Sequence, residues 1–394
     1  MFLIVGNGIS GINTAQIIRE NDKETPILII TKEKYPYYSR PQLIEFLAGN
    51  IGVEDLPFYP NKWYEENNIK VLYEERALKI NLEKKILKTD KDEYNFSKLI
   101  IAVGAIPYKP QLENIKCDGI FTVRNIDDAI NIMSYIKGKE KVILLGCGLL
   151  GLEVGRALSQ RGLKIVGLEF FQRLIPRQLD EEGARILQKR IEEKFGFEFY
   201  LGVKVHKIIL NNNKFCGVEL DDGRKLFGDL MIISAGIVPN IDLAKNSGIV
   251  VNKGIIVNEY METSVENIYS AGDCVEFSGK IYGIIPACLE QSFVVGRNIL
   301  GERVTYQGTV SSNTLKVTGI DLTSIGEIDP KDGDFEIMIK KDEEIGFYRK
   351  LIFRENKIVG AILLGNNRKY VNKIQEYIKS KKNIERKEEL INEN

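Results

Sequence analysis

The chain has 394 residues, of which 44% are apolar and 28% are charged, and this composition excludes disorder as the main state. Lys and Arg number 55 and Asp and Glu number 55, so the net charge is zero and a general nucleic-acid binder is not expected. At about 150 residues per domain, the length predicts two or three domains.

The first hundred residues predict a βαβ unit followed by an antiparallel meander. The expected elements are a strand at 1–5, a glycine turn at 6–11, a helix at 12–20 and a buried strand at 26–30. Short alternating runs from Val71 to Ile101 predict the meander, whose last strand ends at Gly104.

The same order of elements then recurs, with Gly146 lying 140 residues after Gly6. The expected elements are a strand at 141–145, a turn at 146–151, a helix at 153–161, a strand at 164–168, a meander at 197–226 and a strand at 230–234. Gly236 breaks the last strand, as Gly104 does in the first copy. Two copies of one architecture are the simplest interpretation.

The remainder of the chain predicts a helix near 286–300 that starts at a proline, and then a smaller α/β module. That module has strand-like runs at 337–339, 346–354 and 357–364, a helix from about Arg368, and a charged tail after Lys381 that we expect to fray. The fold class is therefore α/β, with two Rossmann-like (three-layer ββα) domains. We assign residues 1–112 and 236–304 to the first domain, 113–235 to the second, inserted domain and 305–394 to the C-terminal module.

The two turns have the spacing G-x-G-x-x-G, which is typical of dinucleotide binding. The glycines are Gly6, Gly8 and Gly11 in the first copy, and Gly146, Gly148 and Gly151 in the second. The first glycine of each set makes the tight turn, the second lets a pyrophosphate approach and the third allows close helix packing. Chance gives roughly 0.27 matches per chain at this glycine content, so two matches, each between a strand and a helix, favour two sites over turns without a ligand.

An acid after each second strand would bind the adenosine ribose. Glu169 follows Gly146 by 23 residues and favours NAD(H) over NADP(H), because a carboxylate repels a 2′-phosphate. Glu169 can instead be a solvated charge at a strand end, and the nearby Arg173 weakens the inference. In the first copy Thr31 holds this position and Glu33 follows two residues later, so that ribose contact stays open.

Several further segments carry a resemblance. They are Gly104–Pro107, Gly236–Asn240 and Ser270–Asp273, and then Tyr37–Pro41, Pro176–Asp180 and Ser312–Lys316. With the glycine turns, the first three resemble the pyridine-nucleotide–disulfide oxidoreductase superfamily over about residues 1–300. The last three resemble, within it, NADH:rubredoxin reductases and the NADH/FAD module of assimilatory nitrite reductases.

The resemblance implies FAD in the first copy and NADH in the second. It places Asp273 at the FAD ribitol or phosphates, Arg40 and Pro41 beside the flavin, Lys316 near the flavin ring, and the helix start at Ala287 toward it; Arg40 and Lys316 are the candidate catalytic residues. Each of these features also has a purely structural interpretation. Asp273 can be a turn residue, Arg40 can form a surface ion pair, and Lys316 can be a structural lysine. The helix that starts near Ala287 can be an ordinary core helix. The expected cofactor-binding residues are Gly6, Gly8, Gly11, Thr31, Glu33, Arg40, Pro41, Ala77, Gly104, Gly146, Gly148, Gly151, Glu169, Gly236, Asp273 and Ala287.

The cysteines and the single histidine, His206, limit the chemistry. None of the five cysteines lies in a C-x-x-C or C-x-x-x-x-C pattern, and Tyr38–Pro41, where relatives with one redox cysteine keep it, has none. Activity is therefore expected to be independent of thiols, with a cytoplasmic location and no metal site. No apolar run reaches the ~20 residues of a membrane-spanning helix, so no membrane association is expected.

These features predict an FAD-dependent NADH:acceptor oxidoreductase. Hydride passes from NADH to FAD, and electrons then pass to rubredoxin or a similar small iron protein, which the resemblance implies to be acidic. The alternatives are an NADH oxidase that uses dioxygen, an NADH-binding flavoprotein subunit of a larger redox complex, and a redox-sensing scaffold. The sequence leaves the physiological acceptor and the oligomeric state open.

Overall fold

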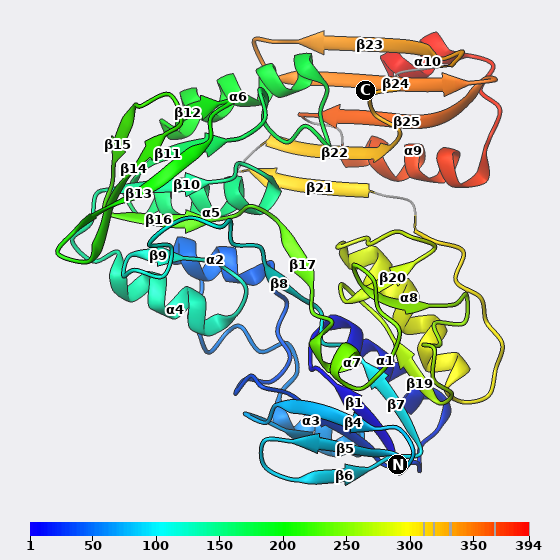
Figure 1. The fold of residues 1–394 in the computed structure, drawn as a ribbon. Helices are drawn as coiled ribbons and strands as arrows, with labels where there is room; N and C mark the ends of the chain where they lie inside the picture. Colours follow the sequence, from blue (N-terminus) through cyan, green and yellow to red (C-terminus); the bar gives the residue numbers. More distant parts are fainter. Residues whose placement is uncertain (310–311, 318–319, 331–332, 366–367, 394) are drawn as a thin grey trace. The chain divides into compact units, whose positions relative to one another are not determined.

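The computed structural model describes residues 1–309, 312–317, 320–330, 333–365 and 368–393, and the chain divides into two compact units (Figure 1). Unit 1 consists of Met1–Gln42, Gly52–Pro107 and Ile237–Thr309; unit 2 consists of Leu43–Ile51, Tyr108–Gly236 and Val310–Asn394. Within the described ranges, every helix is too short or too polar to span a bilayer.

A five-stranded parallel sheet forms the centre of unit 1, in the order β19-β7-β1-β2-β3. The strands are β19 (Ile268–Ser270), β7 (Lys98–Ile101), β1 (Phe2–Val5), β2 (Ile27–Ile30) and β3 (Ile69–Leu72). β1 and β2 are apolar and buried throughout, as parallel strands covered on both faces require. Helix α1 (Ile9–Asn21) follows β1 and packs against α8 (Ile285–Asn298), where Gly296 allows close approach to Ile17.

The predicted meander of the first copy is wrong at both ends, since residues 98–101 form β7, which pairs in parallel with β1. Residues 69–72 form β3, which pairs in parallel with β2, because Ile69 is buried in the core of the central sheet. The antiparallel meander itself consists of β4 (Ala77–Asn81), β5 (Ile86–Thr89) and β6 (Glu93–Asn95). The remaining elements of unit 1 are α3 (Asn61–Glu66), β8 (Ala105–Pro107) paired with β17 (Ile237–Pro239), α7 (Asp242–Asn246), and β18 (Ile255–Val257) paired with β20 (Val275–Phe277).

Unit 2 contains a second parallel sheet, in the order β12-β11-β10-β16-β9. Its strands are β12 (Glu198–Leu201), β11 (Lys164–Glu169), β10 (Lys141–Leu145), β16 (Leu230–Ile233) and β9 (Ile120–Phe121). Its helices are α4 (Ile126–Tyr135), α5 (Leu149–Gln160) and α6 (Glu181–Phe195), and an antiparallel meander consists of β13 (Val205–Asn211), β14 (Lys214–Leu220) and β15 (Lys225–Phe227). As in the first copy, the start of the predicted meander is wrong, since 198–201 pairs in parallel with β11.

The C-terminal module of unit 2 is an antiparallel sheet with two helices, drawn in yellow to red in Figure 1. The strand order is β21 (Ser312–Val317), β22 (Ile320–Gly326), β25 (Lys357–Leu364), β24 (Phe347–Arg354) and β23 (Glu336–Asp342), and the helices are α9 (Arg368–Ser380) and α10 (Lys387–Asn392).

The tail after Lys381 does not fray, which corrects the sequence prediction. It forms α10, and Ile384, Leu390 and Ile391 are buried in the core of the module. The Arg349 guanidinium donates to the Ile391 carbonyl at 2.8 Å and satisfies a carbonyl at the end of this helix. Three apolar side chains and one buried cation therefore fix a segment whose other residues are mostly charged.

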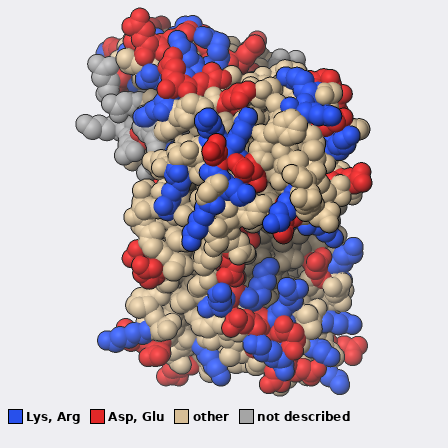
Figure 2. Space-filling view, turned by 90° about the vertical axis from the view of Figure 1, so that its left-hand side faces the viewer, with Lys and Arg blue, Asp and Glu red and all other residues tan. Residues whose placement is uncertain are grey.

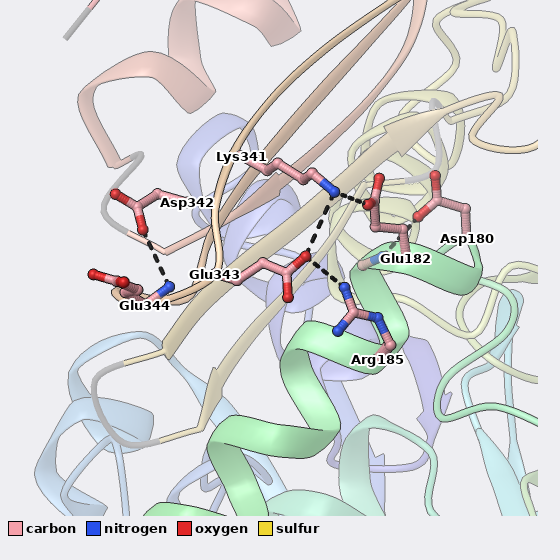
Figure 3. A network of polar contacts seen from close by, with 8 residues as sticks. Asp180, Glu182, Arg185, Lys341, Asp342, Glu343 and Glu344 are labelled. Carbon is pink, nitrogen blue, oxygen red and sulfur yellow. Dashed lines mark hydrogen bonds and ion pairs between the residues drawn. The ribbon is translucent and has the colours of Figure 1, made fainter.

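The module packs on α6 through two groups of polar contacts. At the helix start, Asp180 accepts hydrogen bonds from Tyr348 Oη at 2.7 Å and from Lys350 Nζ at 2.8 Å. Further along, Figure 3 shows an exposed network in which Arg185 pairs with Glu343 at 2.6 Å. Lys341 joins that network by contacting both Glu182 and Glu343.

Helix α2 (Gln42–Ala48) belongs mostly to unit 2, although it follows the first βαβ unit in the chain. Glu45 pairs with Arg156 of α5 at 3.1 Å, and Arg161 Nε donates to the Leu47 carbonyl at 3.2 Å. The sequence did not predict this placement, because it depends on an ion pair and a hydrogen bond between segments more than 100 residues apart.

Candidate functional site

The first glycine turn joins β1 to α1 in the conformation that a dinucleotide site needs. Gly6 has φ +110°, and a Cβ there would lie 2.3 Å from the Ala102 carbonyl oxygen. A Cβ at Gly11 would lie 1.9 Å from the Gly6 oxygen, whereas one at Gly8 would meet nothing within 4 Å. The outer glycines therefore allow close packing, and open space lies over the middle one at the start of α1.

The second glycine turn, between β10 and α5, repeats this geometry. A Cβ at Gly146 (φ +97°) would lie 2.4 Å from the Ser234 oxygen, and one at Gly151 would lie 2.2 Å from the Gly146 oxygen. Gly148 again faces open space within 4 Å. Both turns therefore fit a pyrophosphate over the second glycine, against the N–H groups of a helix start.

A pocket lies beside the first turn, and its lining includes Gly8, Thr31, Glu33 and Arg40. The Arg40 Nη1 atom is buried and has no hydrogen-bond partner among the described residues. A cationic donor left in this state next to a glycine turn fits a negatively charged or hydroxyl-bearing cofactor group. Arg40 also forms an ion pair with Glu33 at 3.3 Å, which agrees with the alternative interpretation of this residue as part of a surface ion pair.

Glu33 is held in this pocket by two side chains. Tyr38 Oη donates to one carboxylate oxygen at 2.5 Å, and Arg40 Nη2 donates to the other. The Thr31 hydroxyl, in contrast, accepts the Glu33 backbone N–H at 3.2 Å and is used locally. The carboxylate that lines the pocket therefore stands two residues beyond the usual position.

Asp273 and the start of α8 lie together against α1. The Gly272 N–H donates to Gln291 Oε1 at 2.8 Å, and Ser292 Oγ donates to the Ser10 carbonyl at 3.2 Å. The Cys288 thiol donates to Asp273 Oδ1 at 3.5 Å, and burial is the main cause that raises the pKa of this thiol to about 12. Unit 1 thus brings Asp273 and the helix start near the buried Ala287 to the first glycine turn.

Glu169 is fixed at the second turn by backbone donors. Its carboxylate accepts the Cys147 N–H at 2.8 Å and the Phe171 N–H at 3.1 Å, and the residue is 7% exposed. Burial raises the pKa of the Cys147 thiol, so this side chain packs in the turn as an uncharged group. Since each carboxylate oxygen can accept more than one hydrogen bond, Glu169 can still bind ribose hydroxyls.

The other expected residues lie at separate places. Gly104 and Gly236 precede the paired strands β8 and β17 and have φ +66° and +102°. Pro41 is exposed and Ala77 is half-buried at the start of β4. Lys316 belongs to β21, and its side chain lies outside the described part of the structure.

Two βαβ units with matching glycine turns, one inserted in the chain between parts of the other, define the class of proteins with two dinucleotide-binding folds. The chain belongs to the pyridine nucleotide-disulphide oxidoreductase family, whose model matches residues 2–292. Residues 312–382 match the C-terminal domain of rubredoxin NAD+ reductase. The predicted fold class, family and cofactor pair, FAD and NADH, are confirmed.

The relatives include proteins with different acceptors. The chain is 33% identical to "Nitrite reductase [NAD(P)H]" of Bacillus subtilis over 93% of its length and 45% of the relative, and 32% identical to "NADH-rubredoxin oxidoreductase" of Clostridium acetobutylicum over 92% of its length and 90% of the relative. It is 33% identical to "NADH oxidase" of Methanocaldococcus jannaschii over 93% of its length and 88% of the relative.

The chain spans about half the length of the first two curated relatives it matches, at 45% and 48%. Among solved structures, NADH:rubredoxin oxidoreductase from Clostridium acetobutylicum matches with a TM-score of 0.80 and 31% identity. That match covers 98% of this chain and 96% of that structure.

Proposed function

We propose that the chain is an NADH-dependent flavoprotein reductase that passes electrons from FAD to rubredoxin or a similar small iron protein. The observation that carries the proposal is the pair of matching glycine turns, each with a carboxylate held beside it by hydrogen bonds. That carboxylate is Glu33 at the first turn and Glu169 at the second. The C-terminal match to rubredoxin NAD+ reductase and the relative named NADH-rubredoxin oxidoreductase support the choice of acceptor.

In this proposal the chain mainly binds and orients its cofactors. Bound FAD accepts hydride from NADH and releases electrons to the acceptor. Transfer between stacked rings depends on orientation more than on an acid or base, which agrees with a chain whose only histidine, His206, is exposed in the meander of unit 2. Glu33 and Glu169 would hold the two adenosine riboses, and Asp273, Arg40 and the helix start at Ala287 would bind FAD.

The five cysteines support direct electron exit from the flavin. All five are free, and burial is the main cause that raises the pKa of both Cys274 and Cys288. A protonated, buried thiol is a poor nucleophile and a poor redox relay. The unpaired cysteines also support our proposal of a cytoplasmic location.

We keep the three-domain division as part of the proposal. The FAD domain consists of residues 1–112 and 236–304, the NAD domain of 113–235 and the C-terminal module of 305–394. The compact units agree with an insertion near residues 107–237, and unit 2 joins the last two of these segments in one body.

The test is anaerobic mixing of the FAD-loaded protein with NADH, followed by an acceptor panel. We expect loss of the oxidised-flavin absorbance with NADH, and then faster turnover with rubredoxin than with dioxygen. No flavin reduction would overturn the enzyme assignment and leave a scaffold. Reduction followed by faster turnover with dioxygen would favour the oxidase, the activity in the name of the Methanocaldococcus jannaschii relative.

A further inference from the structure

A basic side chain next to the proposed NADH site is engaged by the C-terminal module. Arg173 Nη2 lies 3.2 Å from Asp329 Oδ2. Arg173 follows β11, whose last residue is Glu169, and Asp329 follows β22 in the C-terminal module. The two side chains are 31% and 48% exposed, so both can also reach a ligand from solvent.

The backbone after β11 keeps Arg173 within reach of the adenosine ribose. The Phe171 N–H donates to the Glu169 carboxylate at 3.1 Å, so the chain turns directly at the acid. Arg173 is two residues further, which is at most about 7 Å of backbone, and its side chain is long and flexible. An arginine near this ribose is the group that accommodates the 2′-phosphate of NADP(H).

The ion pair makes Arg173 a poor phosphate ligand. One guanidinium nitrogen is already bound to Asp329, and the carboxylate cancels much of the charge that would attract a phosphate. A 2′-phosphate placed beside Arg173 would also face two carboxylates, those of Asp329 and Glu169. We propose that Asp329 excludes NADP(H) by holding and neutralising Arg173, so that the C-terminal module helps to set cofactor specificity.

This inference rests on the proposed NADH site at Glu169, and the structure offers a matched control. Arg185 and Glu343 form an ion pair at 2.6 Å, which also joins the inserted domain to the C-terminal module (Figure 3). Arg185 lies on α6 and Glu343 directly follows β23, and among the described residues neither side chain contacts Glu169 or Arg173. Glu343→Gln therefore removes the same kind of contact without releasing the arginine near the ribose.

The experiment measures the binding of an adenine nucleotide with and without a 2′-phosphate, so it does not depend on turnover. Isothermal titration calorimetry on the FAD-loaded protein compares 2′-phospho-ADP with ADP for the wild type, Asp329→Asn, Glu343→Gln and the double variant Arg173→Ala with Asp329→Asn. We expect Asp329→Asn to tighten 2′-phospho-ADP by about fivefold to tenfold and to leave ADP within about twofold. Glu343→Gln should change neither the affinity for 2′-phospho-ADP nor that for ADP. The double variant should bind 2′-phospho-ADP no more tightly than the wild type does.

Two results would overturn the inference, and they are distinguishable. If ADP binds all variants but Asp329→Asn does not tighten 2′-phospho-ADP, the role of Asp329 is wrong and the NADH site stands. If ADP binds none of the FAD-loaded proteins, the proposed NADH site fails as well. Equal melting temperatures of Asp329→Asn and Glu343→Gln would show that the comparison is made on folded protein.

Discussion

At the scale of single residues, the two glycine turns place their carboxylates in different ways. Glu169 stands directly at the end of β11 and is fixed by two backbone N–H groups. Glu33 stands two residues beyond β2 and is fixed by the side chains of Tyr38 and Arg40. Glu169 therefore stabilises its own turn as well as any bound ribose, whereas Glu33 depends on the segment that leads to Arg40.

We expect NADH to be preferred over NADPH by roughly 1–3 kcal/mol, which is the contribution of a hydrogen bond to a charged group. Glu169→Ala should narrow this preference. It should also lower the free energy of unfolding by about 1–3 kcal/mol, because it leaves the N–H groups of Cys147 and Phe171 without an acceptor.

The ratio of kcat/KM for the two cofactors and urea denaturation of the variant check these expectations. Glu193→Ala is the control, since Glu193 is 52% exposed and its ion pairs with other described residues, to Lys189 and Arg190 on α6, are long, at 3.9 and 4.0 Å. Equal kcat/KM for both cofactors in the wild type would contradict the preference.

Replacement of all five cysteines by serine or alanine should leave NADH-to-acceptor turnover within about tenfold, or ~1.4 kcal/mol. Burial raises the pKa of Cys147, Cys274 and Cys288, so these thiols stay protonated through neutral pH. The pH–rate profile should therefore be the same with and without them. A several-hundredfold loss with flavin retained would show that Cys274 or Cys288 takes part.

At the scale of helices and strands, patterns within one segment were predictable and contacts between distant segments were not. The strands β1, β2, β10 and β11 follow from continuous apolar runs, and both glycine turns from their spacing. The meander starts were wrong, because the edge strands 69–72 and 198–201 each contain a charged residue and lack the continuous apolar run of the central parallel strands.

The candidate site shows the same division. The glycines and Glu169 could be proposed from the sequence because each follows a strand at a fixed spacing, and Asp273 could be proposed from the resemblance of Ser270–Asp273. The choice between Thr31 and Glu33 could not, because it depends on where the Tyr38 hydroxyl points. Nor could the pairing of Arg173 with Asp329, which lie 156 residues apart.

The start of α6 forms a largely buried polar contact with the C-terminal module. Asp180 caps the helix by accepting the Gly183 N–H at 3.0 Å and also binds Tyr348 and Lys350 of the module. Burial alone would raise the pKa of Asp180, but the hydrogen bonds from Lys350, Tyr348 and Gly183 outweigh it and lower the pKa. The carboxylate therefore stabilises the folded protein in its ionised form.

Asp180→Asn should destabilise unit 2 by about 3–5 kcal/mol near neutral pH, because it leaves the Lys350 ammonium, 7% exposed, without its counter-ion. Since the folded-state pKa is lowered, the contribution of the carboxylate is complete above about pH 4 and is lost as the pH falls through that pKa. The stability difference between wild type and variant should therefore shrink at low pH.

Urea denaturation at several pH values measures this difference. Tyr348→Phe is the control, because it removes one neutral donor and keeps the ion pair, so it should cost only about 1.5 kcal/mol near neutral pH and depend less on pH than Asp180→Asn does. A difference between wild type and Asp180→Asn that stays constant down to pH 2 would contradict the role of the charge.

At the scale of the whole molecule, attraction of an acidic partner has to come from a local group of charges. The net charge is zero, and Figure 2 shows Lys and Arg interspersed with Asp and Glu on the face in view. Long-range attraction by the molecule as a whole is therefore weak. Steering then depends on the few cations near the flavin, for which Arg40 and Lys316 are our candidates.

We therefore expect kcat/KM for an acidic rubredoxin to fall as salt rises, because screening weakens attraction between opposite charges. The rate of flavin reduction by NADH should change little, since ring stacking orients that step. Lys316→Glu should lower kcat/KM for rubredoxin and leave the rate of flavin reduction by NADH unchanged. Lys341→Glu is the control, because Lys341 is bound to Glu182 of α6 and to its neighbour Glu343 and has no proposed part in docking. Stopped-flow reduction of the flavin and steady-state reduction of rubredoxin, each over a salt series, separate the two steps. If rubredoxin is reduced no faster than dioxygen and without salt dependence, the acceptor assignment is wrong and the oxidase becomes the better account.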